Sequence, residues 1–169
     1  MQRKILFLLG ILLCANFAVE GFTEGGRMKV TSPAFKNSAY LPQRFSCDGD
    51  GVNPALEITG IPAQAQSLAL IVDDPDAPIG TYVHWVVFDI PVVALIEENS
   101  VPGKQGVNTG GRKDYVSPCP PSGTHRYFFK VYALDTLLNL EEGISKGALE
   151  KAMQGHILDQ AQIIGLCKR

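Results

Sequence analysis

The alternation of hydrophobic and polar residues predicts a protein built mainly from strands. Residues 67–74 form a nearly continuous apolar run, which is typical of a strand buried on both faces. Residues 82–91 and 126–134 are rich in aromatic and β-branched side chains, which strands favour. Weaker strand patterns occupy residues 28–35, 56–62 and 161–169.

One helix is predicted near the C-terminus. Ser145 can cap it, and helical spacing places five residues on one face: Ala148, Leu149, Ala152, Met153 and His156. His156 is therefore expected to be structural. Because the strands do not alternate with helices, the pattern predicts a mostly β fold, a β-sandwich with one or two small peripheral helices.

The first residues have the plan of a secretory signal peptide. Arg3 and Lys4 precede an apolar run over residues 5–13, and small residues follow. The run is shorter than the roughly 20 apolar residues that span a bilayer. We therefore predict a signal peptide over about residues 1–20, a single domain over residues 21–169, no transmembrane segment after cleavage, and export to the periplasm or the medium. The alternatives are lipid attachment at Cys14 and an uncleaved, buried helix.

Three cysteines remain after such a cleavage, namely Cys47, Cys119 and Cys167. Outside the cytoplasm a disulfide can persist, but three cysteines leave at least one without a partner in the chain. Cys47 and Cys119 both stand in loops beside the candidate site residues, so they are the expected pair; three unpaired buried thiols are the alternative. Their spacing contains no metal-binding motif.

Composition excludes one class of partner. The chain has 169 residues, 15 basic and 17 acidic side chains and a formal charge of −2, without a basic block. Nucleic acid is therefore not an expected partner.

The sequence DDPDAP at residues 73–78 ends the most apolar strand. It gathers Asp73, Asp74 and Asp76 beside two prolines, Pro75 and Pro78, that fix the local backbone. The simpler interpretation is an ordinary turn, since Asp and Pro are common turn residues.

Two histidines also stand near strand ends. His84 shares a strand face with Val86 and Phe88, where a lone histidine is more often a core residue than a ligand. His125 precedes a strand and shares its side with Tyr127. If the strands are neighbours, four side chains converge on a spot that suits an anion or a metal: Asp74, His84, His125 and Tyr127.

Arg126 should face away from this spot. Pairing with Asp76 or Asp74 would lock two loops together, a structural role that supports the site. Hydrolase motifs are missing from the sequence: it has neither a GxSxG elbow nor a Walker loop, and Cys119 is the one nucleophile candidate near His125.

The segments DDPDAP, HWVVFDIP and PPSGTHRYFFKVYALD, in this order, resemble the phosphatidylethanolamine-binding protein family. The bacterial and archaeal branch, often called Raf kinase inhibitor-like, is the closer match. The resemblance extends over about residues 28–168 and includes FSCDGDGVNPALEITGIP and GHILDQAQIIG. It implies a Greek-key β-sandwich with a small pocket for phosphate-like groups, phospholipid head groups included, in a binding or inhibitory protein that is not an enzyme.

The resemblance also implies the residues of that pocket. They are Asp74, Ala77, Pro78, Tyr82, His84, Pro118, His125 and Tyr127, supported by Asp76 and Arg126. The chain departs from the branch at Val116 and Ser117, where paired glycines are usual. Glycine there would let a backbone N–H approach the ligand, so a change in ligand size is expected.

Three hypotheses follow from the sequence. The first is an exported protein that binds a phosphate-like anion or phospholipid head group, with a regulatory or inhibitory role and neither metal nor cofactor. Its affinity should rise below about pH 6.5, where unperturbed histidines become charged. The second is a metal-assisted hydrolase that uses Asp74, His84 and His125. The third is inhibition of a protein kinase or a protease through the loop over residues 96–124.

Overall fold

The computed structural model describes residues 27–169. The predicted signal peptide over residues 1–20, its cleavage site and Cys14 lie outside the described residues. Within residues 27–169, no helix is long and apolar enough to cross a membrane.

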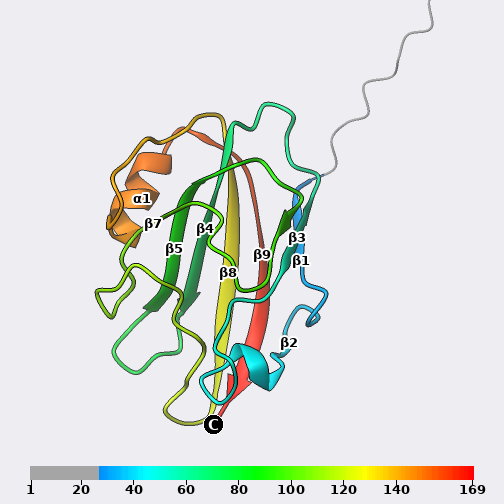
Figure 1. Ribbon diagram of the computed structural model, residues 1–169, viewed down its shortest axis with the longest axis vertical. Coiled ribbons are helices and arrows are strands. Elements are labelled where there is room, and N and C mark those ends of the chain that lie inside the picture. Colours follow the sequence, from blue (N-terminus) through cyan, green and yellow to red (C-terminus); the bar gives the residue numbers. More distant parts are fainter. Residues whose placement is uncertain (1–26) are drawn as a thin grey trace, which may run out of the picture.

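Six strands form the larger of two sheets (Figure 1). Its order is β2 (Ala39–Tyr40), β9 (Ile157–Lys168), β8 (Thr124–Leu134), β4 (Ser67–Asp74), β5 (Tyr82–Ile90) and β7 (Lys104–Gln105). All neighbours are antiparallel except β2 and β9. β4 is central and buried along its whole length, which confirms the prediction from its apolar run. β9 begins four residues before the predicted strand.

The second sheet is small and has the order β1 (Lys29–Thr31), β3 (Leu56–Thr59) and β6 (Leu95–Ile96). The strand pattern over residues 28–35 is thus realised only in part. The inner core, between the two sheets, joins side chains of the small sheet to one face of the large sheet: Val30, Leu56, Ile58 and Ile96 with Leu70, Val72, Trp85, Val87, Tyr127 and Phe129. This two-sheet arrangement confirms the predicted mostly β fold.

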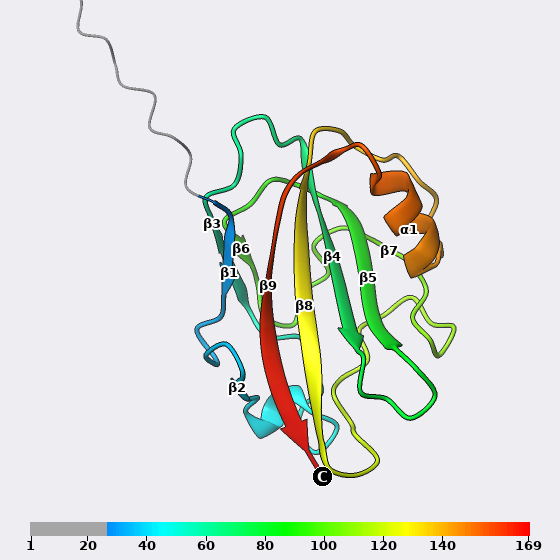
Figure 2. The same cartoon turned by 180° about the vertical axis from the view of Figure 1, so that it is seen from behind.

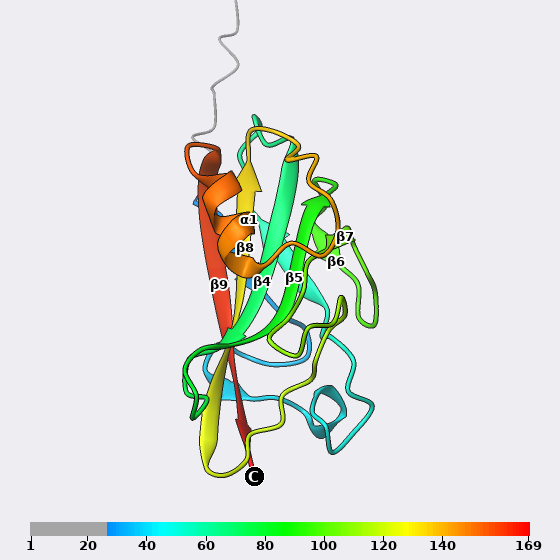
Figure 3. The same cartoon turned by 90° about the vertical axis from the view of Figure 1, so that its left-hand side faces the viewer.

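The helix α1 (Lys146–Met153) covers the other face of the large sheet (Figure 3). Its Leu149 and Met153 pack in an outer core with residues of β4, β5 and β8: Ala69, Ile71, Val86, Phe88 and Leu134. The Ser145 hydroxyl accepts a hydrogen bond from the N–H of Ala148 at 3.2 Å, which confirms the predicted cap. One turn of 3-10 helix, η1 (Gln43–Phe45), lies in the chain between β2 and β3.

The sequence predicted His156 on the apolar face of α1, and this prediction was wrong. The helix ends three residues earlier, and His156 is exposed and pairs with the Asp135 carboxylate at 2.8 Å. The chain turns out of the helix here because Gly155 adopts a left-handed conformation with φ of 82°.

One end of the large sheet collects four strand termini. The end of β4 pairs with the start of β5, and the start of β8 pairs with the end of β9. The C-terminus lies at this end beside the start of β8 (Figure 2). The predicted histidines and aspartates are therefore brought to one place by the antiparallel topology.

Candidate functional site

A cavity of about 380 Å³ lies at this end of the large sheet. Its walls come from the end of β4 and the turn after it, the starts of β5 and β8, and the loop between β7 and β8. The lining residues are Asp74, Ala77, Pro78, Ile79, Tyr82, His84, Val116, Ser117, Cys119, Pro120, Pro121, His125 and Tyr127. All the pocket residues expected from the sequence line it, except Pro118.

Pro118 is buried behind the cavity wall, where its carbonyl accepts a hydrogen bond from the N–H of Cys47 at 3.0 Å. Its neighbours in the loop form the wall instead. Sequence reasoning missed Ile79, Cys119, Pro120 and Pro121 as lining residues. The prolines beside Pro118 carried a signal, because a rigid loop was expected there, but which of its residues face inward depends on the loop's path.

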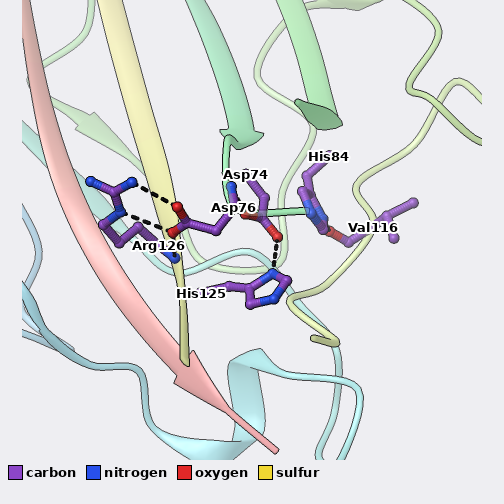
Figure 4. Close-up of polar contacts among 6 residues, drawn as sticks. All are labelled: Asp74, Asp76, His84, Val116, His125 and Arg126. Carbon is purple, nitrogen blue, oxygen red and sulfur yellow. Dashed lines mark hydrogen bonds and ion pairs between the residues drawn. The ribbon is translucent and has the colours of Figure 1, made fainter. Parts of the chain in front are cut away.

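Asp74 is the central carboxylate of the cavity and only 3% exposed (Figure 4). Its Oδ2 accepts a hydrogen bond from Nδ1 of His125 at 2.7 Å. Its Oδ1 accepts the backbone N–H of Asp76 at 2.8 Å. Both carboxylate oxygens therefore have partners within the protein, and Asp74 holds the His125 ring in one orientation.

Arg126 lies outside the cavity and clamps the turn after β4 to the start of β8 (Figure 4). Its guanidinium bonds both oxygens of Asp76, at 2.6 and 2.9 Å, and its backbone N–H bonds the same carboxylate at 2.9 Å. This pairing lowers the pKa of Asp76 to about 2. The pair stabilises the fold above the ordinary carboxyl pKa of 3.8, and the stabilisation is lost as the pH falls toward 2.

His84 is fixed by a reciprocal contact with Val116. Its Nδ1 donates to the Val116 carbonyl at 2.7 Å, and the Val116 N–H donates to the His84 carbonyl at 3.0 Å. Burial lowers the pKa of His84; the Val116 carbonyl and the charges of Asp74 and Asp73 oppose this change. The ring is therefore neutral at pH 7, with its hydrogen on Nδ1.

The strand face predicted for His84, that of Val86 and Phe88, was wrong. Val86 and Phe88 pack in the outer core, but His84 lines the cavity and meets the Tyr127 ring edge-on at 5.1 Å. The cause is a β-bulge: Val72 pairs with Trp85, whereas the next residue of β4 pairs with Val83. The extra residue is His84, and a bulge of this kind can turn a side chain to the other face.

Tyr127 contributes a buried hydroxyl without a hydrogen-bond partner in the described part of the chain. The side chain is fully buried, yet it lines the cavity. Burial, followed by the charge of Asp74, raises the pKa of Tyr127. The group is a neutral hydroxyl at pH 7, and an unsatisfied buried hydroxyl in a native protein calls for an explanation.

A disulfide joins Cys47 to Cys119 across 72 positions, with the Cα atoms 5.4 Å apart. This confirms the predicted pair and excludes three unpaired thiols; Cys167 is the buried free thiol of the described residues. The disulfide and the Cys47–Pro118 hydrogen bond fasten the cavity wall to the loop after η1. Since Cys119 is oxidised, it is no candidate nucleophile.

Val116 and Ser117 replace the expected paired glycines without backbone strain. Neither residue has a positive φ, so the backbone here does not require glycine. The Val116 N–H is engaged by His84 and is not available to a ligand. The Ser117 hydroxyl instead approaches Gly51, where a Cβ atom would lie 3.3 Å from its oxygen.

The cavity is not arranged as a metal centre. Among residues 27–169, no group of three or more His, Cys, Asp or Glu side chains could hold a metal ion. Asp74 already bonds His125 and Asp76, and Nδ1 of each cavity histidine is occupied.

A larger hollow of about 550 Å³ lies elsewhere, against β8 and β9 and lined by Arg27, Met28, Lys130, Tyr132, Gln160, Ala161 and Gln162. It has no histidine, and its Lys130 pairs with Asp73 at 2.8 Å. The smaller cavity, which holds an unsatisfied hydroxyl and two free imidazole nitrogens, is therefore the stronger candidate.

Comparison with known proteins identifies relatives over nearly the whole described chain. The family model for phosphatidylethanolamine-binding protein matches residues 31–168. A UPF0098 protein of Methanothermobacter thermautotrophicus is 47% identical over 150 residues, which cover 84% of this chain and 99% of the relative. A UPF0098 protein of Aquifex aeolicus is 47% identical over 173 residues, which cover 96% and 99%.

Two solved structures are also similar. A phosphatidylethanolamine-binding protein homologue from Chlamydia trachomatis has a TM-score of 0.82 and 41% identity, covering 85% of this chain and 98% of that chain. YbcL of E. coli, described as a member of the mammalian family, has a TM-score of 0.76 and 30% identity, covering 85% and 99%.

Proposed function

The chain belongs to the phosphatidylethanolamine-binding protein family, and from this premise we propose that its cavity binds a small phosphate-like anion or a phospholipid head group. The observation that carries the proposal is the buried Tyr127 hydroxyl, which lacks a partner in the described chain and lines a cavity with two histidines. A ligand oxygen would accept its hydrogen and satisfy a group whose burial alone is costly.

The role proposed for each residue follows from its contacts. Tyr127 donates its hydroxyl hydrogen, and the two histidines contact the ligand through Nε2, because Nδ1 of each is occupied. Asp74 positions His125, while Asp76 and Arg126 hold the turn in place. Tyr82, Ala77 and Pro78 form the walls. Pro118 supports the wall from behind.

A binding role without catalysis is part of the proposal. Cys119 is in the disulfide, and within residues 27–169 no Ser, Thr or Cys side chain hydrogen-bonds to either cavity histidine. A nucleophile activated by an adjacent base is therefore not formed there. The alternative, a metal-assisted hydrolase using Asp74, His84 and His125, gains no support from the arrangement of these side chains.

The experiment is calorimetric titration of the purified protein with phosphate and with phosphoethanolamine, after metal analysis of the same sample. Tyr127→Phe removes only the hydroxyl and should weaken binding about tenfold, the loss of roughly one hydrogen bond. Tyr132→Phe, on the other face of β8, is the matched control and should bind as the wild type does. If the wild type bound neither phosphate nor phosphoethanolamine, the proposal would be overturned.

We extend the proposal to export, to the periplasm or the medium. The Cys47–Cys119 disulfide supports it, since disulfides persist in oxidising compartments. Intact-mass measurement of protein from the source cells should show loss of about the first 20 residues. A full-length mass with reduced cysteines would contradict export.

A regulatory or inhibitory role toward a protein kinase or protease is the remaining part of the proposal. The loop over residues 96–124 cannot be deleted to test it, because Val116, Ser117 and Cys119 of that loop line the cavity. Val101 is 61% exposed in the same loop and does not line the cavity. Val101→Asp should abolish inhibition through the loop surface and leave phosphate affinity unchanged. If Val101→Asp inhibited the target as strongly as the wild type does, the inhibition would not act through this loop surface.

A further inference from the structure

The two cavity histidines are held in the same way by different partners. Nδ1 of His84 donates to the Val116 carbonyl at 2.7 Å, and Nδ1 of His125 donates to the Asp74 carboxylate at 2.7 Å. Both partners are acceptors, so Nδ1 of each ring carries a hydrogen; the neutral ring of His84 therefore has a lone pair on Nε2. Neither Nε2 has a hydrogen-bond partner within residues 27–169.

His84 differs from His125 because its partner is an uncharged carbonyl. His84 is only 5% exposed, and burial is the largest influence on its pKa, in the direction of the neutral ring. The titratable groups that face it from the packed elements are Asp74 of β4, His125 and Tyr127 of β8, and Tyr82 of β5, and the charge of Asp73 acts on it from the other face of the sheet. The two carboxylates favour its charged form, but burial outweighs them.

A neutral His84 and a fully deprotonated oxyanion do not fit each other. The lone pair of Nε2 and the ligand oxygen are both acceptors, so at close range they repel unless one hydrogen lies between them. The Tyr127 hydroxyl has a single hydrogen to donate, so it cannot also supply the hydrogen between a ligand oxygen and Nε2 of His84. The missing hydrogen must arrive with the ligand or from the solvent.

Building on the proposed anion pocket, we infer that the cavity takes up its oxyanion together with one proton, shared between a ligand oxygen and Nε2 of His84. The proton leaves the acid form of the buffer and is taken up between the ligand oxygen and Nε2, and no bond between two heavy atoms forms or breaks. The pocket therefore selects oxyanions that can carry a hydroxyl near neutral pH. Phosphomonoesters such as free phosphoethanolamine meet this requirement, whereas sulfate monoesters and phosphodiesters, including the head group of an intact phospholipid, do not.

The chemistry of the three ligand classes makes the inference specific. A phosphomonoester has a second pKa near 6, so it accepts a proton at small cost at neutral pH. A sulfate monoester has the same tetrahedral shape but remains deprotonated. A phosphodiester has only one ionisable oxygen, which is deprotonated at neutral pH. Methyl phosphate, methyl sulfate and dimethyl phosphate are thus small tetrahedral probes of which only methyl phosphate can take up a proton near neutral pH.

The test is calorimetric titration of the whole protein with the three probes at pH 7.5, in two buffers of different ionisation enthalpy. Methyl phosphate should bind with uptake of about one proton, and its affinity should fall about tenfold between pH 7.5 and 8.5, as one-proton linkage requires. Methyl sulfate and dimethyl phosphate should bind at least about tenfold more weakly.

Two variants separate His84 from the other histidines. His84→Gln replaces the acceptor by an amide that can donate, so proton uptake should disappear and methyl sulfate should approach methyl phosphate in affinity. His156→Gln removes the exposed histidine outside the cavity and should leave proton uptake unchanged. Proton uptake that persists in His84→Gln would assign the proton to His125 and overturn the inference.

The remaining outcomes also decide the matter. Methyl phosphate binding without proton uptake would overturn the inference but leave the proposed anion binding intact. Equal affinities for methyl phosphate and methyl sulfate at pH 7.5 would do the same. Absence of binding by all three probes would overturn the proposed function itself, and the inference with it.

Discussion

Asp73 and Asp74 are adjacent at the end of β4, point to opposite faces of the same sheet and are both buried, at 1% and 3% exposure. On the helix side, Asp73 is paired with two ammonium groups, Lys130 at 2.8 Å and Lys146 at 2.6 Å. On the cavity side, Asp74 positions His125, next to free imidazole nitrogens and an unsatisfied hydroxyl.

The difference separates a structural carboxylate from one that we propose to be functional. The Asp73 cluster is complete, because each charge has a partner and the cluster ties the first residue of α1 to β4 and β8. The polar groups around Asp74 are satisfied only in part. Buried polar groups are normally satisfied, so the incomplete cluster is the one in which a ligand is expected. Four predictions test this comparison, in order of decreasing effect.

The largest effect is expected from the disulfide that holds the cavity wall. Cys47→Ala combined with Cys119→Ala should lower the free energy of unfolding by about 4 kcal/mol, the chain-entropy value for a loop closed across 72 positions. Urea denaturation measures this change. Cys167→Ala, which removes the buried free thiol, is the matched control and should cost less than about 1.5 kcal/mol. A double variant as stable as this control would show that noncovalent contacts alone hold the wall.

Asp73→Asn should lower the free energy of unfolding by about 3 kcal/mol, since it leaves two ammonium groups without their shared carboxylate. This loss of stability is at the low end of the range expected for breaking a buried ion pair, because both lysines are about a quarter exposed and can reach water. Denaturation in urea and calorimetry with methyl phosphate measure stability and affinity on the same variant.

Affinity of Asp73→Asn should remain within about twofold of the wild type. Asp74→Asn is the comparison variant: it can keep one of the two hydrogen bonds of Asp74, so it should lose less stability but at least about tenfold in affinity. If both variants lost affinity equally, the proposed division between the two faces would be wrong.

Sequence reasoning placed the strands of this site correctly but could not divide the two aspartates between structure and function. The apolar run of β4 and the aromatic content of β5 and β8 indicated the strands, and the segments around His84 and His125 indicated the family. The partners of Asp73 lie 57 and 73 positions away, and their meeting depends on β8 and α1 packing on β4. No local pattern encodes such a contact.

The orientation of His84 was unpredictable for a related reason. Strict alternation along β5 assigned it to the face of Val86 and Phe88, but a bulge inserts it as an extra residue against β4. A bulge is a property of the register between two strands, so one strand's sequence does not reveal it. The same holds for Pro118, whose place behind the wall follows from its contact with Cys47.

Tyr127→Phe should raise the free energy of unfolding of the ligand-free protein by about 1 kcal/mol. It deletes a buried hydroxyl that has no partner in the described chain and so removes a desolvation cost. The same change is expected to weaken ligand binding, so stability and affinity should move in opposite directions. Thermal and urea denaturation without ligand measure the first effect, with Tyr132→Phe as the control. A less stable Tyr127→Phe would mean that the hydroxyl is satisfied in the free protein.

The smallest effect concerns how stability depends on pH through His84. Because burial lowers its pKa in the folded state, the unfolded chain binds the proton more readily below about pH 6.5. The wild type should therefore lose stability relative to His84→Gln as the pH falls from 7.5 to 5.5, by at most about 1.4 kcal/mol per pH unit. Saturating methyl phosphate should reverse the sign, because the complex holds one more proton than the free protein. Asp73→Asn, on the complete face, removes a charge that favours the protonated ring, so it should keep the sign of both slopes. A slope with the same sign with and without ligand would mean that the bound proton is not shared with His84.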